Sequence, residues 1–215
     1  MPDWLALADR VLAGEEVTDN EAEAILDCPD SELLLLLQGA YTIRRAYFGN
    51  KVKLNRIMNA KSGLCPENCG YCSQSSISNA PVNTYKMVDK DTLVRGAEEA
   101  YRQQIGTYCI VASGRGPSDK EVDVVVSAVQ EIKERFGLKV CACLGILKPE
   151  QAMRLKEAGV DRYNHNINTS KEHHPNITTS HTYDDRVQTV ETVKQAGMSP
   201  CSGVIIGMKE TKQDV

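Results

Sequence analysis

Residues 107–144 read TYCIVASGRGPSDKEVDVVVSAVQEIKERFGLKVCACL, and the expected architecture of the whole chain follows from their pattern. β-Branched and apolar residues at 107–113, and a short run of mainly apolar residues at 139–144, predict two strands. Between them, Ser118 and Glu121 have the spacing of a capping box, and apolar residues recur every three or four positions up to residue 136. Gly137 is typical of a helix end. The stretch therefore predicts a strand, a helix and a second strand parallel to the first.

The same alternation extends in both directions along the chain. We expect strands at residues 52–59, 107–113, 139–144, 163–168 and 199–207. Helices are expected between them, with Pro149 at the start of one and a capping box from Thr182 to Asp185 at the start of another. Five such units fit either a doubly wound sheet or part of a (βα)8 TIM-type barrel. The residues after position 50 are too few for eight repeats, so we expect a C-terminally truncated barrel whose residues 210–215 lie within an uncapped helix.

The first 50 residues carry helix signals only. Thr18 and Glu21 form a capping box, so a helix is expected to begin near residue 19. Asp30 or Ser31 is expected to cap a further helix, which Gly49 ends. We therefore divide the chain into an N-terminal helical extension, residues 1–50, and a partial barrel, residues 51–215.

The composition excludes several classes of protein. Lys plus Arg is 25 and Asp plus Glu is 29, so the chain lacks the positive charge of a nucleic-acid binder. Its longest apolar run, residues 33–37, is far shorter than a membrane span. No signal-peptide pattern follows Met1, so a cytoplasmic location is expected. The eight cysteines are too few for a disulfide scaffold, and in a reducing compartment they favour metal binding or catalysis.

Three of the cysteines lie in the segment CPENCGYC at residues 65–72, in the loop after the first expected strand. A [4Fe–4S] cluster is usually held by four cysteines, so three thiolates leave one iron open. A small molecule can chelate that iron, for example through the amino and carboxylate groups of S-adenosylmethionine. Structural zinc is the alternative, but it needs four ligands, and neither a second cysteine pair nor a histidine is close in the sequence. The segment therefore predicts an open iron–sulfur site.

Polar side chains also occur where strand interiors are expected. Alternate residues of barrel strands point to the axis, so strand cysteines could converge on a second metal cluster. Each could equally be a small buried hydrophobe. These cysteines are Cys109, Cys141 and Cys201. Buried amides need partners, so a row of asparagines on one strand face favours an interior that holds ligands. The fourth expected strand carries such a row at Asn164, Asn166 and Asn168.

Together these segments resemble a known family. The three-cysteine segment, with Tyr71 before its last cysteine, resembles the radical S-adenosylmethionine superfamily. With YNHN at 163–166 and CSGVIIG at 201–207, the similarity extends to the biotin synthase family, from about residue 50 onward. The resemblance implies a (βα)8-barrel sulfurtransferase, usually a homodimer, that forms biotin by radical insertion of sulfur into dethiobiotin. It also implies an electron-donor protein as partner, and no nucleic acid or membrane.

The resemblance gives each matching residue an expected role. The catalytic [4Fe–4S] cluster, at which S-adenosylmethionine is cleaved, would be held by Cys65, Cys69 and Cys72. A [2Fe–2S] cluster, regarded as the sulfur donor, would be held by Cys109, Cys141 and Cys201. Its fourth ligand in the family is an arginine on a later strand, with no counterpart here, and we expect the 215 residues alone to be inactive. Asn164 would contact the substrate. The residues expected to contact S-adenosylmethionine are Tyr71, Asn166, Asn168 and Ile205.

Two other interpretations remain open. Another radical S-adenosylmethionine enzyme, of hydrogenase-maturation or pyrrolysine-pathway type, would not need all three strand cysteines. A non-catalytic zinc-binding module would need no S-adenosylmethionine. Of the remaining cysteines, Cys28 is expected to pack among the N-terminal helices and Cys143 to line the interior without a ligand role. The loop histidines are expected to be solvated; they are His173, His174 and His181.

Overall fold

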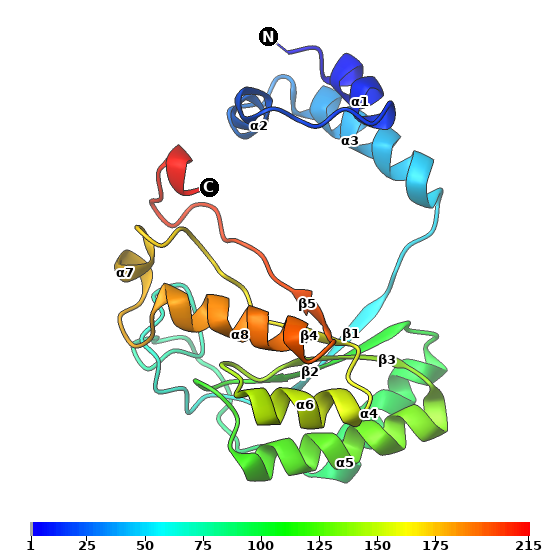
Figure 1. Ribbon diagram of the computed structural model, residues 1–215, viewed down its shortest axis with the longest axis vertical. Helices are drawn as coiled ribbons and strands as arrows, with labels where there is room; N and C mark the ends of the chain where they lie inside the picture. Colours follow the sequence, from blue (N-terminus) through cyan, green and yellow to red (C-terminus); the bar gives the residue numbers. More distant parts are fainter. Residues whose placement is uncertain (1) are drawn as a thin grey trace. The chain divides into compact units, whose positions relative to one another are not determined.

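The alternation of strands and helices after residue 52 builds one sheet of five parallel strands, in the order β1-β2-β3-β4-β5 (Figure 1). The computed structural model describes residues 2–215. Its contacts divide the chain into two units, Met1–Val52 and Lys53–Val215. The strands of the second unit are β1 (Asn55–Lys61), β2 (Thr107–Ala112), β3 (Lys139–Cys143), β4 (Arg162–Asn164) and β5 (Ser199–Cys201).

The helices pack on one another in the same order as the strands. Contacts join α4 to α5, α5 to α6 and α6 to α8, and α4 and α8 also contact strands of the sheet (Figure 1). Their bounds are α4 (Lys90–Arg102), α5 (Asp119–Phe136), α6 (Pro149–Glu157) and α8 (Tyr183–Gln195). Two short elements are α7 (His174–Ile177) and the 3-10 turn η1 (Lys212–Asp214). A strand order without reversal and a continuous row of helices confirm a partial TIM-type barrel rather than a doubly wound sheet.

Local signals place the helix ends, and apolar burial holds the helices to the sheet. The Ser118 side chain accepts a hydrogen bond from Glu121 N, which starts α5, and Gly137 ends that helix with a φ of 61°. Val125 and Ile132 of α5 are fully buried, as is Val140 of β3. This core covers the outward face of the sheet and leaves the opposite face for polar side chains.

The register of the strands sets inward-facing residues side by side. Cys109 of β2 is the partner of Cys141 of β3, and Cys141 is the partner of Arg162 of β4. Two residues further along, Asn164 of β4 is the partner of Cys201 of β5. The interior of the sheet therefore carries thiols, an arginine and an amide on adjacent strands.

Several element ends differ from the sequence expectations. Strands β4 and β5 are three residues long, where six and nine were expected. Asn168 has a φ of 75°, which bends the chain out of the extended form, and only a single bridge to Val204 continues the pairing. Residues 210–215 contain a 3-10 turn rather than an uncapped helix, and at its start the Asp214 carboxylate accepts from Thr211 N at 2.7 Å. That turn corrects the sequence expectation.

The N-terminal unit is helical, as expected, and contains three helices. They are α1 (Trp4–Leu12), α2 (Asp19–Leu26) and α3 (Leu33–Phe48). Gly39 of α3 permits close packing on α1, because a Cβ there would lie 2.7 Å from the Trp4 carbonyl oxygen. The cap of α3 is Glu32 rather than Asp30 or Ser31, and its carboxylate accepts from Trp4 Nε1 at 2.9 Å instead of capping the helix. None of the helices formed by residues 2–215 has the length and apolarity to cross a bilayer.

Candidate functional site

The three-cysteine segment lies directly after β1, at the carboxyl ends of the parallel strands. All three thiols line one cavity of about 290 Å³. Asparagine amides from β4 and the segment after it line the opposite wall, together with Ile205. The sequence-predicted residues that meet in this cavity are Cys65, Cys69, Tyr71, Cys72, Asn164, Asn166, Asn168 and Ile205. We refer to it as the first cavity.

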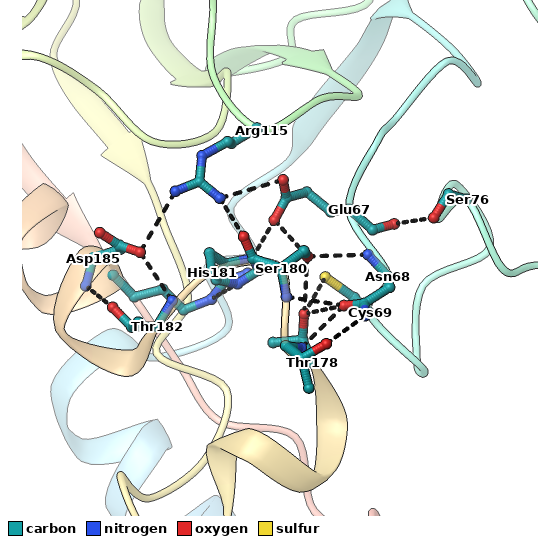
Figure 2. Close-up of polar contacts among 12 residues, drawn as sticks. Glu67, Asn68, Cys69, Ser76, Arg115, Thr178, Ser180, His181, Thr182 and Asp185 are labelled. Atoms are coloured by element: carbon teal, nitrogen blue, oxygen red, sulfur yellow. Dashed lines mark hydrogen bonds and ion pairs between the residues drawn. The ribbon is translucent and has the colours of Figure 1, made fainter.

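Residues 177–181 hold the three-cysteine segment in place (Figure 2). The Asn68 Oδ1 atom accepts from Thr178 Oγ1 at 2.9 Å, from Thr179 N at 3.0 Å and from Ser180 N at 3.1 Å. Gly70 N donates to the Ile177 carbonyl at 2.9 Å. These bonds cross more than 100 residues of sequence, so the conformation of the cysteine loop depends on the loop after β4.

A buried carboxylate joins the same two loops. Glu67 accepts hydrogen bonds from His181 Nδ1 and, at 2.8 Å, from Ser180 Oγ, and it pairs with Arg115 at 3.4 Å (Figure 2). Burial favours the neutral acid, but the bonds from His181 and Ser180 outweigh it and hold the pKa of Glu67 below its ordinary value. Glu67, a buried residue of the three-cysteine loop, is therefore a carboxylate anion.

The partners of His181 fix its tautomer. Arg186 Nε donates to His181 Nε2 at 2.9 Å, and a guanidinium can only donate. His181 Nε2 must then be the acceptor, so Nδ1 carries the proton and donates to Glu67. Burial lowers the pKa of His181, which agrees with this neutral form.

Arg186 is a site residue that the sequence analysis missed. Its Nη1 donates to the Asn166 carbonyl at 2.6 Å and its Nη2 to the Tyr71 hydroxyl at 3.2 Å, and it lines the first cavity. The Tyr71 hydroxyl also accepts from Asn168 Nδ2 at 2.6 Å, and burial raises the pKa of Tyr71 to about 12. A cation in the first turns of α8 is a signal that could have revealed Arg186, because the positive end of a helix disfavours a basic residue there.

A second cavity lies on the same face of the sheet. It is lined by Cys109, Cys141 and Cys201, as alternation along the strands predicts, and also by Cys143. The first and second cavities share Val111, Cys143 and Asn164 as walls. Cys143 Sγ contacts Asn164 Oδ1 at 3.6 Å. The two groups of three cysteines therefore lie in adjoining spaces, with Asn164 between them.

The thiols of the second cavity shift one another's pKa values. A hydrogen bond from Cys141 lowers the pKa of Cys109 to about 7, and Lys53 and Arg162 add to the effect. The same bond and burial raise the pKa of Cys141, and burial raises the pKa of Cys143 to about 11. Of Cys109, Cys141 and Cys143, Cys109 is the thiol most ready to become a thiolate.

The donor set of the first cavity fits an iron–sulfur cluster better than one zinc ion. Across residues 2–215, no three His, Cys, Asp or Glu side chains converge closely enough to bind a single ion. A cluster offers a separate iron atom to each thiolate, so its ligands need not meet at one point. Three thiols that line one cavity without converging suit that kind of ligand.

The expectation that the loop histidines are solvated is wrong. His173, His174 and His181 are all buried. His174 packs edge-on against His181, with ring centroids 5.4 Å apart, and His173 Nε2 bonds the Met208 carbonyl at 3.0 Å. The short helix α7 folds His173 and His174 inward, which sequence polarity alone does not reveal. Cys28 belongs to the N-terminal unit, and its thiol lies 3.6 Å from the Pro29 carbonyl.

Comparison with known proteins gives one family match and several close relatives. Residues 61–215 match the Radical SAM superfamily. The chain is 84% identical over 215 residues to a biotin synthase of Geobacillus thermodenitrificans, and 72% identical over 215 residues to one of Bacillus subtilis. It is covered completely in both alignments and spans 65% and 64% of those two proteins.

Solved structures with the same fold are much less similar in sequence. A crystal structure of methylornithine synthase (PylB) superimposes with a TM-score of 0.85 at 22% identity, over 96% of this chain and 61% of that one. HydG, a maturase of the [FeFe]-hydrogenase, gives a TM-score of 0.78 at 19% identity, over 98% of this chain and 48% of that one. At these identities the likeness concerns the fold alone.

Proposed function

This chain belongs to the Radical SAM superfamily, and from that premise we propose that the protein it represents is a biotin synthase, a cytoplasmic sulfurtransferase that converts dethiobiotin to biotin. The observation that carries the proposal is the pair of adjoining thiol-lined cavities that share Asn164. One cavity with three cysteines is what the superfamily requires. A second cavity with three more is what a built-in sulfur donor would require.

In this proposal Cys65, Cys69 and Cys72 hold a [4Fe–4S] cluster, and Cys109, Cys141 and Cys201 hold a [2Fe–2S] cluster. The first cluster, with bound S-adenosylmethionine, supplies a carbon-centred radical, and the second supplies the sulfur. The protein's own contribution is to bind, orient and shield these groups. The proposal is supported by the two thiol sets lining adjoining cavities that share Asn164.

The first cavity offers complementary groups for S-adenosylmethionine. Arg186 supplies a positive charge for a carboxylate, and it already donates to the Asn166 carbonyl and the Tyr71 hydroxyl. Asn168 supplies an amide where many family members carry aspartate for the ribose, so its hydrogen bonds would be neutral ones. Ile205 gives an apolar wall for the adenine.

Asn164 has the position expected of a substrate contact, because it borders both cavities. Its amide can donate and accept, which suits a ureido group such as that of dethiobiotin. A substrate held at this border would lie between the radical source and the sulfur source. We further propose an electron-donor protein as partner and a homodimeric assembly of the full-length protein.

The test uses the full-length protein, reconstituted without oxygen. We expect about six irons per chain, four and two from the two clusters, and the visible absorption of a [2Fe–2S] centre. A triple variant with alanine in place of Cys109, Cys141 and Cys201 should no longer form biotin. It should still cleave S-adenosylmethionine to 5′-deoxyadenosine. A matched Cys28→Ala variant should retain both activities.

Other results would overturn the proposal. About four irons with no [2Fe–2S] spectrum, together with a fully active triple variant, would point to another radical S-adenosylmethionine reaction. A colourless protein with one zinc per chain would point to a zinc-binding module.

A further inference from the structure

The second cavity is electrically unusual, because its lining contains cations and thiols but no carboxylate. Lys53 and Arg162 line it beside Cys109, Cys141 and Cys201. Lys53 is exposed, whereas Arg162 is half-buried. A half-buried cation normally has an acidic partner, since removing its charge from water is costly.

Arg162 has no such partner. Within residues 2–215 its guanidinium makes no side-chain hydrogen bond and no ion pair with a carboxylate. The adjacent acid, Asp161, is occupied elsewhere: it accepts from Lys133 Nζ at 2.5 Å and from Val140 N at 2.7 Å. Among the residues that the structure describes, no acceptor therefore bonds the five donors of Arg162.

The strand register places this free cation level with two of the proposed cluster ligands. Arg162 is the strand partner of Cys141, and Cys141 is the partner of Cys109. All three lie on the inward face of the sheet and line the same cavity. The arrangement is a row of thiol, thiol and guanidinium on three neighbouring strands.

We propose that Arg162 is a positioning residue of the second cluster, whose guanidinium faces the thiolates and sulfides and offsets their negative charge. The inference rests on the proposed function, because it assumes a [2Fe–2S] centre in this cavity. Three thiolates on such a centre make it an anion, and one-electron reduction adds a further negative charge. A fixed cation stabilises the reduced form more than the oxidised form, so it raises the reduction potential.

Arginine suits this role better than other residues. It stays charged at every physiological pH, and its planar donors can point at cluster sulfurs. Hydrogen bonds to sulfur and net charge are both known determinants of cluster potential. Lys53 shares the sign of the charge, but its exposure leaves it more screened by water.

The experiment is a potentiometric titration of the full-length, reconstituted protein with dithionite, followed by visible absorption and EPR. Arg162→Met should shift the [2Fe–2S] potential to a more negative value and lower the iron and sulfide retained there. Arg162→Lys keeps the charge and should restore most of the potential. The spectrum of the [4Fe–4S] centre should stay unchanged in both variants.

Arg56→Met is the matched control. Arg56 is on neighbouring β1, but its side chain bonds Gln103 and Glu99 on the helix side of the sheet. Its loss should leave the potential as in the unmodified protein. Circular dichroism of each variant checks that a shift does not come from misfolding.

Three outcomes would overturn the inference. A normal potential in Arg162→Met shows that the charge does not act on the cluster. A normal potential with a raised KM for dethiobiotin assigns Arg162 to the substrate instead. If the unmodified protein carries no second cluster, the proposed function and this inference fail together, which separates that case from the other two.

Discussion

Glu67 and His181 lie 114 residues apart in the sequence and form a buried hydrogen-bonded pair between the three-cysteine loop and the loop that precedes α8. Because Arg186 donates to the far nitrogen of His181, the pair continues to a guanidinium in the first cavity. One chain of polar contacts therefore connects the cysteine loop with the wall that faces it.

Removing Glu67 should loosen this connection. Glu67→Ala leaves the buried donors of His181 and Ser180 without an acceptor, so we expect a loss of about 2–4 kcal/mol in the free energy of unfolding. Glu67→Gln keeps one acceptor oxygen, so its loss in the free energy of unfolding should be smaller. Urea denaturation measures both.

The control for Glu67 is Glu98→Ala, which removes an exposed pair with Arg102 within α4. Its effect should stay within about 0.5 kcal/mol. An Ala variant of Glu67 that unfolds like this control would show that the buried pair does not hold the loops together.

Stability should fall on mild acidification. Burial lowers the pKa of His181 from its ordinary 6.5 and lowers that of His165 to about 3. The unfolded chain therefore takes up protons before the folded chain does, and stability is lost as the pH falls from 6.5 towards the folded pKa values. The urea midpoint should be highest near neutral pH and decrease between pH 6.5 and 5.

His181→Gln isolates the contribution of His181. A neutral amide can still donate to Glu67 and accept from Arg186, so the contacts can persist without a titrating group. The slope of the urea midpoint between pH 6.5 and 5 should become shallower than in the unmodified protein. Equal slopes would mean that His181 does not contribute to the acid sensitivity.

Cys109 should be more reactive than Cys141 or Cys143 when the protein is stripped of metal. Its pKa of about 7 makes a large fraction thiolate at neutral pH. Cys141→Ala removes the main hydrogen-bond donor, so alkylation of Cys109 by iodoacetamide at pH 7 should slow about five- to tenfold. Mass spectrometry of the peptide that contains Cys109 follows the rate, and an unchanged rate would contradict the assigned bond.

Gly145 should tolerate no side chain. It has a φ of 94°, and an added Cβ would lie 2.4 Å from the Arg115 carbonyl oxygen. Gly145→Ala should therefore destabilise the protein by more than the roughly 1–2 kcal/mol of a left-handed residue alone. Gly137→Ala is the control, because Gly137 also has positive φ but has open space around it. Equal losses in thermal unfolding for the two variants would show that the space around Gly145 can adapt.

Much of the architecture could be predicted because its signals are local. Capping boxes at Ser118 and Thr182, and Pro149 at a helix start, are read within four residues of sequence. Strand alternation was enough to direct Cys109 and Cys141 to one side of the sheet. The lengths of β4 and β5 could not be predicted in this way, because they depend on the pairing of the two strands, which ends at Asn164 and Cys201.

The burial of the loop histidines and the position of Arg186 were also beyond local patterns. His174 sits in a polar segment, and only the packing of α7 brings it inward. Arg186 belongs to a mostly polar helix, in which one more charged residue does not stand out, so its contact with Tyr71 emerges only when α8 meets the cysteine loop.

By itself, the sequence determined that parallel βα units follow a helical segment and that a three-cysteine loop comes after the first strand. These properties depend on neighbours a few residues apart. The tertiary structure alone decided that Glu67 meets His181, that the two thiol-lined cavities share Asn164, and that Arg162 lies beside Cys141 without an acidic partner. Such contacts join residues from separate strands and loops, and they arise only when the sheet is paired in register and the helices are packed on it.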